Sequence, residues 1–163
     1  MQVSWHKVIG WSELLAGVAG LGGILFTGMR PSPVTLPASY YLVAVAGFVL
    51  AIQAGWLLLS GARWGLPLSA LVQALQVVQV STGSAAFSFA AGLQVLVRRT
   101  PGSWKISSGM NTGVWIGPTS LPFESFVAVN LLALLALWLL LRPSPTDTSS
   151  RRRREGQAPE TAA

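Results

Sequence analysis

Four long apolar blocks, separated by short polar segments, constrain the possible folds of this chain more than any other feature. They cover residues 8–29, 38–60, 65–97 and 121–141. A helix needs about 20 consecutive apolar residues to cross the hydrocarbon core of a bilayer, which is about 30 Å thick. The first, second and fourth blocks have that length, so the sequence predicts membrane-spanning helices.

Charged residues are too few, and too unevenly placed, to cover a small soluble protein. Of the 163 residues, 10% are charged and 52% are hydrophobic, whereas a typical soluble domain is about 25% charged. A small body has much surface for its volume and therefore needs many polar residues outside. Because nearly all the charges lie between the apolar blocks or in the C-terminal tail, lipid is the better solvent for the remainder.

The third apolar block is too long for a single crossing, because as one helix it would measure about 50 Å. The segment 81–84, Ser-Thr-Gly-Ser, is poor in helix formers and is the natural place for a break. We therefore expect a membrane helix over residues 66–83. Pro67 then lies in the first turn, where its missing N–H costs nothing.

Residues 85–120 are rich in serine, glycine, threonine, aromatic and β-branched residues. The segments 93–97, 104–107 and 113–116 have the composition of strands, and residues 100–103 have that of a turn. This pattern predicts a small β-hairpin or three-stranded cap outside the bilayer. A re-entrant half-helix over 85–97 is the alternative, which would have to be buried by other helices.

Together these features predict an all-α integral membrane protein with four transmembrane helices, over about 8–29, 38–60, 66–83 and 121–141. These helices form one membrane domain, residues 1–142, with an extracytoplasmic β-hairpin insert at 85–120. Residues 143–163 are expected to be a disordered basic cytoplasmic tail. A cleavable signal peptide is the less favoured reading of the first block, since Glu13 interrupts it and it exceeds the usual length of about 7–15 apolar residues.

The distribution of basic residues predicts the orientation in the membrane, because cytoplasmic loops carry an excess of lysine and arginine. On the side of the two termini lie Lys7, Arg63, Arg142, Arg151, Arg152, Arg153 and Arg154. On the other side lie Arg30, Arg98, Arg99 and Lys105. This favours a multi-pass protein of the cytoplasmic (inner) membrane with both termini in the cytoplasm, although the balance reverses without the distal arginine run.

The net charge of +6 might suggest nucleic acid, but four of the eleven basic residues form the run Arg151 to Arg154. A basic run beside a membrane helix is typical of contact with anionic lipid. The interleaved aromatic and basic residues of a nucleic-acid groove are missing. We therefore expect the lipid bilayer as a partner, and no nucleic acid.

Polar side chains inside apolar helices are costly, so they usually face protein or water. The candidates for such an intramembrane polar core are Glu13, Gln53, Gln73, Gln76, Gln79 and Asn130. The last three glutamines are spaced by three and would form one stripe on a helix face. Depths counted from the rise per residue place Glu13, Gln53 and Gln73 in one layer, and Gln76 and Asn130 in a second layer near the midplane.

Two roles are open for this polar core. The residues could bond across helices and hold them together, or they could line a path for a transported ligand. Glu13 is the best functional candidate, because it could relay protons or pair with a cation, although a structural bond to Gln53 is favoured. Near the outer interface, Glu124 could pair with Arg98 or Arg99.

Several chemistries are excluded by residue type. The chain has no cysteine and a single histidine, His6, which rules out disulfides, thiolate metal sites and multi-histidine metal sites. No HExxH, P-loop or GxSxG motif is present. No cofactor or metal is therefore expected, and an enzyme acting on lipid or quinone ranks last.

The sequence thus predicts a small, non-enzymatic, multi-pass membrane protein. The favoured role is an accessory or structural subunit that forms a homo-oligomer or binds a membrane protein partner. The alternative is a small transporter or channel that uses Glu13 and the glutamine stripe.

Overall fold

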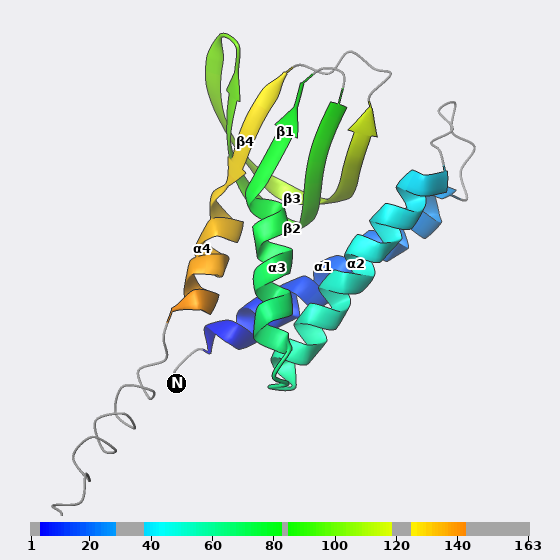
Figure 1. Cartoon of the computed structure of the whole chain (residues 1–163), viewed down its shortest axis with the longest axis vertical. Coiled ribbons are helices and arrows are strands. Elements are labelled where there is room, and N and C mark those ends of the chain that lie inside the picture. Colours follow the sequence, from blue (N-terminus) through cyan, green and yellow to red (C-terminus); the bar gives the residue numbers. More distant parts are fainter. Residues whose placement is uncertain (1–3, 29–37, 83–84, 119–124, 143–163) are drawn as a thin grey trace, which may run out of the picture.

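The computed structural model describes residues 4–28, 38–82, 85–118 and 125–142, which form four helices and four strands. In chain order these are α1 (Trp5–Gly28), α2 (Ala38–Leu59), α3 (Gly65–Val77), β1 (Val78–Ser81), β2 (Ala85–Thr100), β3 (Ser103–Pro118), β4 (Phe126–Asn130) and α4 (Leu131–Leu141). Figure 1 shows the sheet at one end of the body and the helices at the other. The start of α1, the α2–α3 turn and the end of α4 all lie at the helical end.

The prediction of an all-α protein with four membrane-spanning helices is wrong, because the chain is mixed α/β with a four-stranded antiparallel sheet. The predicted helix over 66–83 ends at Val77 and continues as β1. The predicted helix over 121–141 begins only at Leu131, directly after β4. At about 1.5 Å per residue, α3 and α4 are about 20 and 17 Å long, too short to cross a bilayer.

The physical reason for this difference lies in two short segments, Val78–Ser81 and Phe126–Asn130, in which valine alternates with other residues. The hydropathy of these two segments is compatible with a membrane helix and with a strand of a sheet. Their β-branched side chains favour the strand. The two segments pair with each other from Val78↔Val129 to Ser81↔Phe126. Among the described residues only α1 and α2 are long and apolar enough to cross a membrane, judged by length and composition.

The sheet closes on itself around β2. On one edge, β2 pairs with β3 over its whole length, from Ala85↔Pro118 to Thr100↔Ser103. On the other edge, its first half pairs with β1 at residues 86 and 87, and its second half pairs with β4 at residues 96–99. Because β1 and β4 also pair with each other, the two halves of β2, β1 and β4 form a closed ring of paired strands with an inner face.

Figure 1 shows that β2 bends along its length. Gly92 lies between its two halves, after the pairing with β1 and before the pairing with β4. Its φ of 103° is in the region that favours glycine. A glycine in a strand interior often marks a bend or a close approach of backbone. The bend brings β2 against the middle of α1, where a Cβ on Gly92 would lie 3.4 Å from the Cβ of Ala16.

The segments predicted as strands, 93–97, 104–107 and 113–116, lie inside β2 and β3, and residues 100–103 form the tip of their hairpin. The alternative of a half-helix over 85–97 does not apply, since these residues belong to β2. The predicted extracytoplasmic insert is therefore part of the four-stranded sheet rather than a separate cap. The predicted tail, 143–163, lies outside the described residues.

The two long helices pack closely because glycines face each other. A Cβ on Gly55 would lie 2.5 Å from the carbonyl oxygen of Gly10, and one on Gly17 would lie 2.9 Å from that of Phe48. Small residues at such contacts let helix backbones approach. A cluster that includes Ala51, Val72 and Phe89 then joins α2, α3 and β2 into one core.

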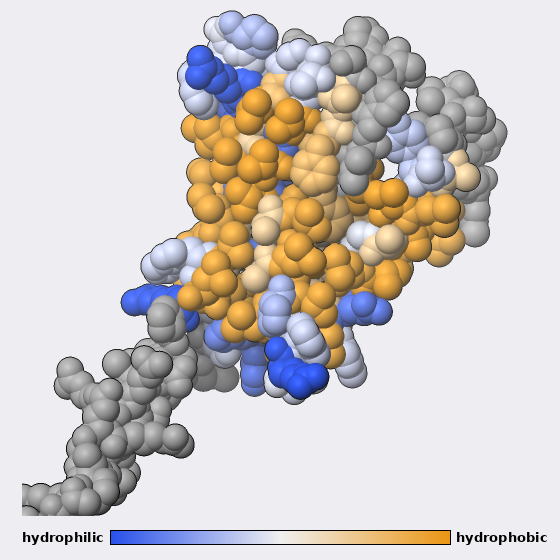
Figure 2. Space-filling model, viewed as in Figure 1, coloured by the Kyte–Doolittle hydropathy of each residue, from blue (hydrophilic) through white to orange (hydrophobic). Residues whose placement is uncertain are grey.

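The flank of the body is apolar. Figure 2 shows hydrophobic residues covering the helices and much of the sheet, with hydrophilic residues gathered mostly at the two ends. Large apolar side chains are exposed on the helices and also on the sheet, where Leu93, Ile106 and Met110 are each more than two-thirds exposed. A continuous apolar surface of this kind is typical of contact with lipid or with another protein.

Candidate functional site

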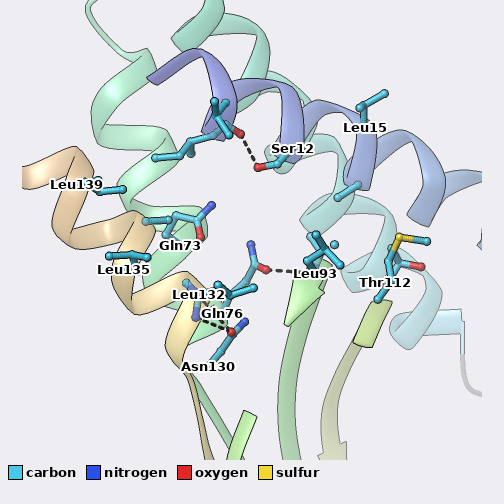
Figure 3. A pocket seen from close by; sticks show the side chains of 18 of the residues that line it. Ser12, Leu15, Gln73, Gln76, Leu93, Thr112, Asn130, Leu132, Leu135 and Leu139 are labelled. Atoms are coloured by element: carbon cyan, nitrogen blue, oxygen red, sulfur yellow. Dashed lines mark hydrogen bonds between the residues drawn. The ribbon is translucent and has the colours of Figure 1, made fainter. Parts of the chain in front are cut away.

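A cavity of about 530 Å³ lies between α1, α4 and the bend of β2, and we call it the α1–α4 groove. Its walls are mostly apolar, with Ile9 and Leu15 from α1 and Leu135 and Leu139 from α4 among them. Figure 3 shows these helices on either side of the groove, with three amide side chains between them. The groove therefore joins apolar walls to a small set of polar groups, as ligand sites commonly do.

The three amides are Gln73, Gln76 and Asn130. Gln73 and Gln76 project from the last turns of α3, and Asn130 stands at the junction of β4 and α4. The other lining residues with polar groups are Ser12, Thr112 and Trp5, whose indole carries an N–H donor. The hydroxyl of Ser12 donates to the carbonyl oxygen of Ile9, one turn earlier, at 2.8 Å.

Two of these amides accept hydrogen bonds from backbone N–H groups of β2 where this strand has no described strand neighbour on one edge. Between the pairing with β1, which ends at Phe87, and the pairing with β4, which begins at Leu96, this edge has no strand partner among the described residues. The Oε1 atom of Gln76 accepts from Ala91 N at 3.1 Å, and Asn130 Oδ1 accepts from Val95 N at 3.4 Å. Side chains thus replace a missing strand, because buried backbone donors need acceptors.

Asn130 also caps α4. Its Oδ1 atom accepts from Leu132 N at 3.2 Å and from Ala133 N at 3.5 Å. Asparagine is among the best residues for this position, since its side chain satisfies N–H groups that the first helical turn leaves open. The amide nitrogen, Nδ2, is buried and has no partner among the described residues.

A second polar cluster, Glu13–Ser69–Gln73, joins α1 to α3. Ser69 Oγ donates to Glu13 Oε2 at 2.6 Å, and Gln73 Nε2 donates to Glu13 Oε1 at 2.8 Å. Glu13 is 1% exposed and is the one acidic residue in the described part of the chain. Both carboxyl oxygens are therefore satisfied by α3, and the cluster fixes α1 against it.

The inner face of the closed sheet is also polar. Gln79 and Ser81 of β1, Gln94 of β2 and Asn130 of β4 are all buried there. Arg98 follows on β2, with its guanidinium carbon 4.2 Å from the centre of the Phe126 ring. Several buried side-chain atoms at this face have no hydrogen-bond partner among the described residues.

The structure distributes the predicted polar core over four places. Glu13 and Gln73 of the predicted first layer are hydrogen-bonded, whereas Gln53 is exposed on α2. Gln76 and Asn130 of the predicted second layer both line the groove. Gln79 continues the glutamine spacing but lies in β1, on the inner face of the sheet.

The predicted outer pairing cannot be followed to its acid, because Glu124 lies outside the described residues, as do Arg151 to Arg154. Arg98 and Arg99 occupy successive positions of β2 and so point to opposite faces of the sheet. Arg98 lies over Phe126, and Arg99 lies 5.3 Å from the centre of the Trp104 ring. The two arginines therefore have different surroundings.

Three polar residues of these clusters were not found from the sequence: Ser69, Ser81 and Gln94. A signal for Ser69 is its position four residues before Gln73, which puts both on one helix face. Gln94 shares a strand face with Leu96 and Arg98. That alternation indicates a buried face only once the neighbouring strands are known.

Comparison with protein families, with curated proteins and with solved structures finds no match to this chain.

Proposed function

We propose that this chain is a non-enzymatic membrane protein that binds one amphiphile, a molecule with an apolar chain and a polar head, in the α1–α4 groove. The observation that carries this proposal is the combination of apolar helix walls with three amides in one cavity of about 530 Å³. That volume lies within the range of about 300–1,000 Å³ usual for small-molecule sites. The amides would orient the head by hydrogen bonds, and the leucines would hold the chain.

In the membrane placement that we propose, the groove receives its ligand from the bilayer. In this placement α1 and α2 cross the bilayer, which their length and composition allow. The groove then opens sideways, because Leu15 and Leu135 on its two walls are partly exposed on the flank of the body. A lipid-like molecule would enter from the bilayer without passing through water.

The orientation that we propose has both termini in the cytoplasm and the protein in the cytoplasmic membrane. Lys7 in α1, Arg63 in the α2–α3 turn and Arg142 after α4 belong to the helical end of the body. Arg98, Arg99 and Lys105 belong to the hairpin of the sheet. In the described part of the chain the basic residues thus lie at two separate ends, three at each, as expected for a protein with a lipid-facing belt between them. The run Arg151 to Arg154 in the C-terminal sequence favours the side of the termini as the cytoplasmic one.

The groups in the groove favour binding over catalysis. Amides and hydroxyls such as those of Gln73, Gln76 and Thr112 give and accept hydrogen bonds but do not exchange protons readily near neutral pH. An accessory role also fits the outer edge of β3, which has no strand neighbour in the described part of the chain. Such an edge can pair with a strand of a partner or of a second copy.

A transporter or channel that uses Glu13 and the glutamines receives less support. Glu13 is buried and both of its oxygens are already bonded within the protein, while Gln53 faces outward on α2. Flux in liposomes that is abolished by Glu13→Gln, with the fold retained, would reverse this preference.

The groove can be tested by filling it. Ala136 on α4 lines the groove, whereas Leu134 is exposed and does not. The protein is extracted in a mild detergent, and native mass spectrometry counts the lipid-like molecules that stay bound. We expect bound amphiphile in the wild type and in Leu134→Trp, and its loss in Ala136→Trp. Equal retention in both variants, or none in the wild type, would contradict the proposal.

A further inference from the structure

All five buried side-chain atoms that lack a hydrogen-bond partner in the described residues lie at the inner face of the closed sheet. They are Gln79 Nε2, Ser81 Oγ, Gln94 Nε2, Arg98 Nε and Asn130 Nδ2. Native structures leave few buried polar groups without partners, and each such group calls for an explanation. Five on one face indicate a ligand or ordered water rather than scattered exceptions.

The strand register shows that these atoms share a face. Residues directly opposite each other in antiparallel strands point to the same side. Gln79 of β1 and Arg98 of β2 are both opposite Ala128 of β4, one from each side. Ala128 is 0% exposed, so its small methyl group leaves the interior to the two long polar side chains.

The five atoms without partners are mostly hydrogen-bond donors. Four of the five atoms are nitrogen donors, and the fifth is a hydroxyl that can also donate. The orientation of Asn130 is fixed by its backbone partners, because a flipped amide would turn its NH₂ group toward the N–H groups of Val95 and Leu132. Asn130, whose amide is fixed in this way, and Arg98, whose guanidinium only donates, therefore suit a group that accepts hydrogen bonds.

The positive charge of the basic residues near this face also favours a negatively charged acceptor. Arg98 carries a permanent positive charge, and Lys105 of β3 is directly opposite it in the register. Glu13, the one acid among the described residues, is already held by Ser69 and Gln73. An oxyanion would supply both the negative charge and the acceptors, and hydrogen bonds assisted by charge are the strong ones.

Asn130 connects this face to the α1–α4 groove, since it lines the groove and also belongs to the inner face. Along β4, Ala128 lies two residues from Asn130, which is about 6.6 Å of strand. Gln79 and Arg98 are both opposite Ala128, which is the next residue of β4 that faces inward after Asn130. A hydrogen-bond acceptor beside Asn130 therefore lies close to these two side chains.

From this geometry we infer that the occupant of the groove is an anionic amphiphile, whose oxyanion is bound by Asn130, Gln79, Gln94 and Arg98 at the inner face of the sheet. This inference rests on the proposed function, because it names the class of molecule that the groove would hold. The oxyanion could belong to an amphiphile or to free phosphate, which share the same chemistry.

The test compares three probes that separate these sources: dodecyl phosphate, 1-dodecylglycerol, which has the same chain length and a neutral head without an oxyanion, and inorganic phosphate. Affinity for the full-length protein in a mild nonionic detergent is measured by native mass spectrometry or by the shift in unfolding temperature. We expect dodecyl phosphate to bind at least about tenfold more tightly than 1-dodecylglycerol, as one hydrogen bond to a charged group would give.

Neighbouring arginines provide a matched pair of variants. Arg98→Gln should reduce the preference for dodecyl phosphate to about twofold or less, whereas Arg99→Gln, on the opposite face, should leave it unchanged. Gln79→Leu is a second variant that should weaken dodecyl phosphate binding without changing the net charge. The unfolding temperature of each variant without probe shows whether it is folded.

Three outcomes would overturn the inference. Equal loss in Arg98→Gln and Arg99→Gln would mean that surface charge attracts the probe. Equal binding of both amphiphiles would leave only ordered water at the inner face. Inorganic phosphate binding as tightly as dodecyl phosphate would show that the anion does not arrive on an apolar chain. Failure of the proposed function looks different, since Ala136→Trp would then leave the binding of both amphiphiles intact.

Discussion

The two buried polar regions of this protein are built from the same kinds of side chain but differ in how they are satisfied. In the Glu13–Ser69–Gln73 cluster, hydroxyl and amide donors reach both carboxyl oxygens. At the inner face of the sheet, donors from three strands end without a partner among the described residues. The side chains of both regions are buried to a similar extent. Hydrogen-bond partners, rather than depth of burial, therefore decide whether a buried polar region stabilises the fold or costs free energy.

Backbone geometry explains the contrast. Ser69 and Gln73 are four apart on α3 and so lie on the same helix face, from which both reach one residue of α1. In the sheet, the residue opposite Gln79 and Arg98 is Ala128, and the residue opposite Asn130 is Leu96. The residues directly opposite these polar side chains are therefore apolar and offer no side-chain acceptor.

Removing the acceptor of the satisfied cluster should have the largest effect. Glu13→Ala leaves the donors of Ser69 and Gln73 buried without partners and opens a cavity. We expect a loss of about 3 kcal/mol or more in the free energy of unfolding, measured in detergent by tryptophan fluorescence. Glu13→Gln is the control and should lose clearly less, because the amide oxygen can keep one donor satisfied. Equal losses in both variants would show that the carboxylate charge, and not the bonding pattern, holds α1 to α3.

Asn130 takes part in both kinds of interaction, so its removal should have the next largest effect. Asn130→Ala removes the cap of α4 and the acceptor for Val95 N, with an expected loss of about 2 kcal/mol in the free energy of unfolding. Asn130→Ser, which keeps a capping oxygen, should recover about half of that loss. A stability unchanged in the alanine variant would mean that water caps α4 equally well.

The unsatisfied region should respond in the opposite sense. Replacing Gln79 by Leu removes an unpartnered donor and keeps similar volume, so the ligand-free protein should stay within about 1 kcal/mol of the wild type or become more stable. Thermal unfolding after removal of bound lipid by detergent exchange measures this change. A loss as large as that of Glu13→Ala would erase the distinction between the two regions.

The smallest effect is expected at the exposed glutamine of α2. Gln53→Leu should change the free energy of unfolding by less than about 0.5 kcal/mol, since the side chain lies outside both polar regions. The same unfolding assay applies. A large loss there would indicate a contact of Gln53 with lipid or with a second copy.

Hydropathy predicted the two long helices well and the other elements poorly. Residues 8–29 and 38–60 were expected as helices, and the structure has α1 at Trp5–Gly28 and α2 at Ala38–Leu59. The error came at Val78–Ser81 and Phe126–Asn130, where apolar content continues but the backbone turns into strand. Strand pairing depends on partners that are distant in the sequence, such as Val78↔Val129. Hydropathy averaged over neighbouring residues contains no information about such partners.

The candidate site was predictable only in part, for the same reason. The cost of polar residues in an apolar setting drew attention to Glu13, Gln73, Gln76 and Asn130, which the structure places in the Glu13 cluster or in the groove. A helical period assigned Gln79 to the same stripe. The period changes from 3.6 to 2 after Val77, so Gln79 faces the inside of the sheet together with Gln94, which the sequence did not single out.

The junctions between helix and strand contain no loop: α3 runs directly into β1, and β4 directly into α4. A loop would absorb a change in tilt, but a continuous backbone transmits it. Each of these helices is therefore coupled directly to the strand next to it in the chain. An outward movement of α4, which entry of the proposed amphiphile would require, would therefore act directly on the pairing of β4 with β1 and β2, and this pairing connects the groove to the inner face of the sheet.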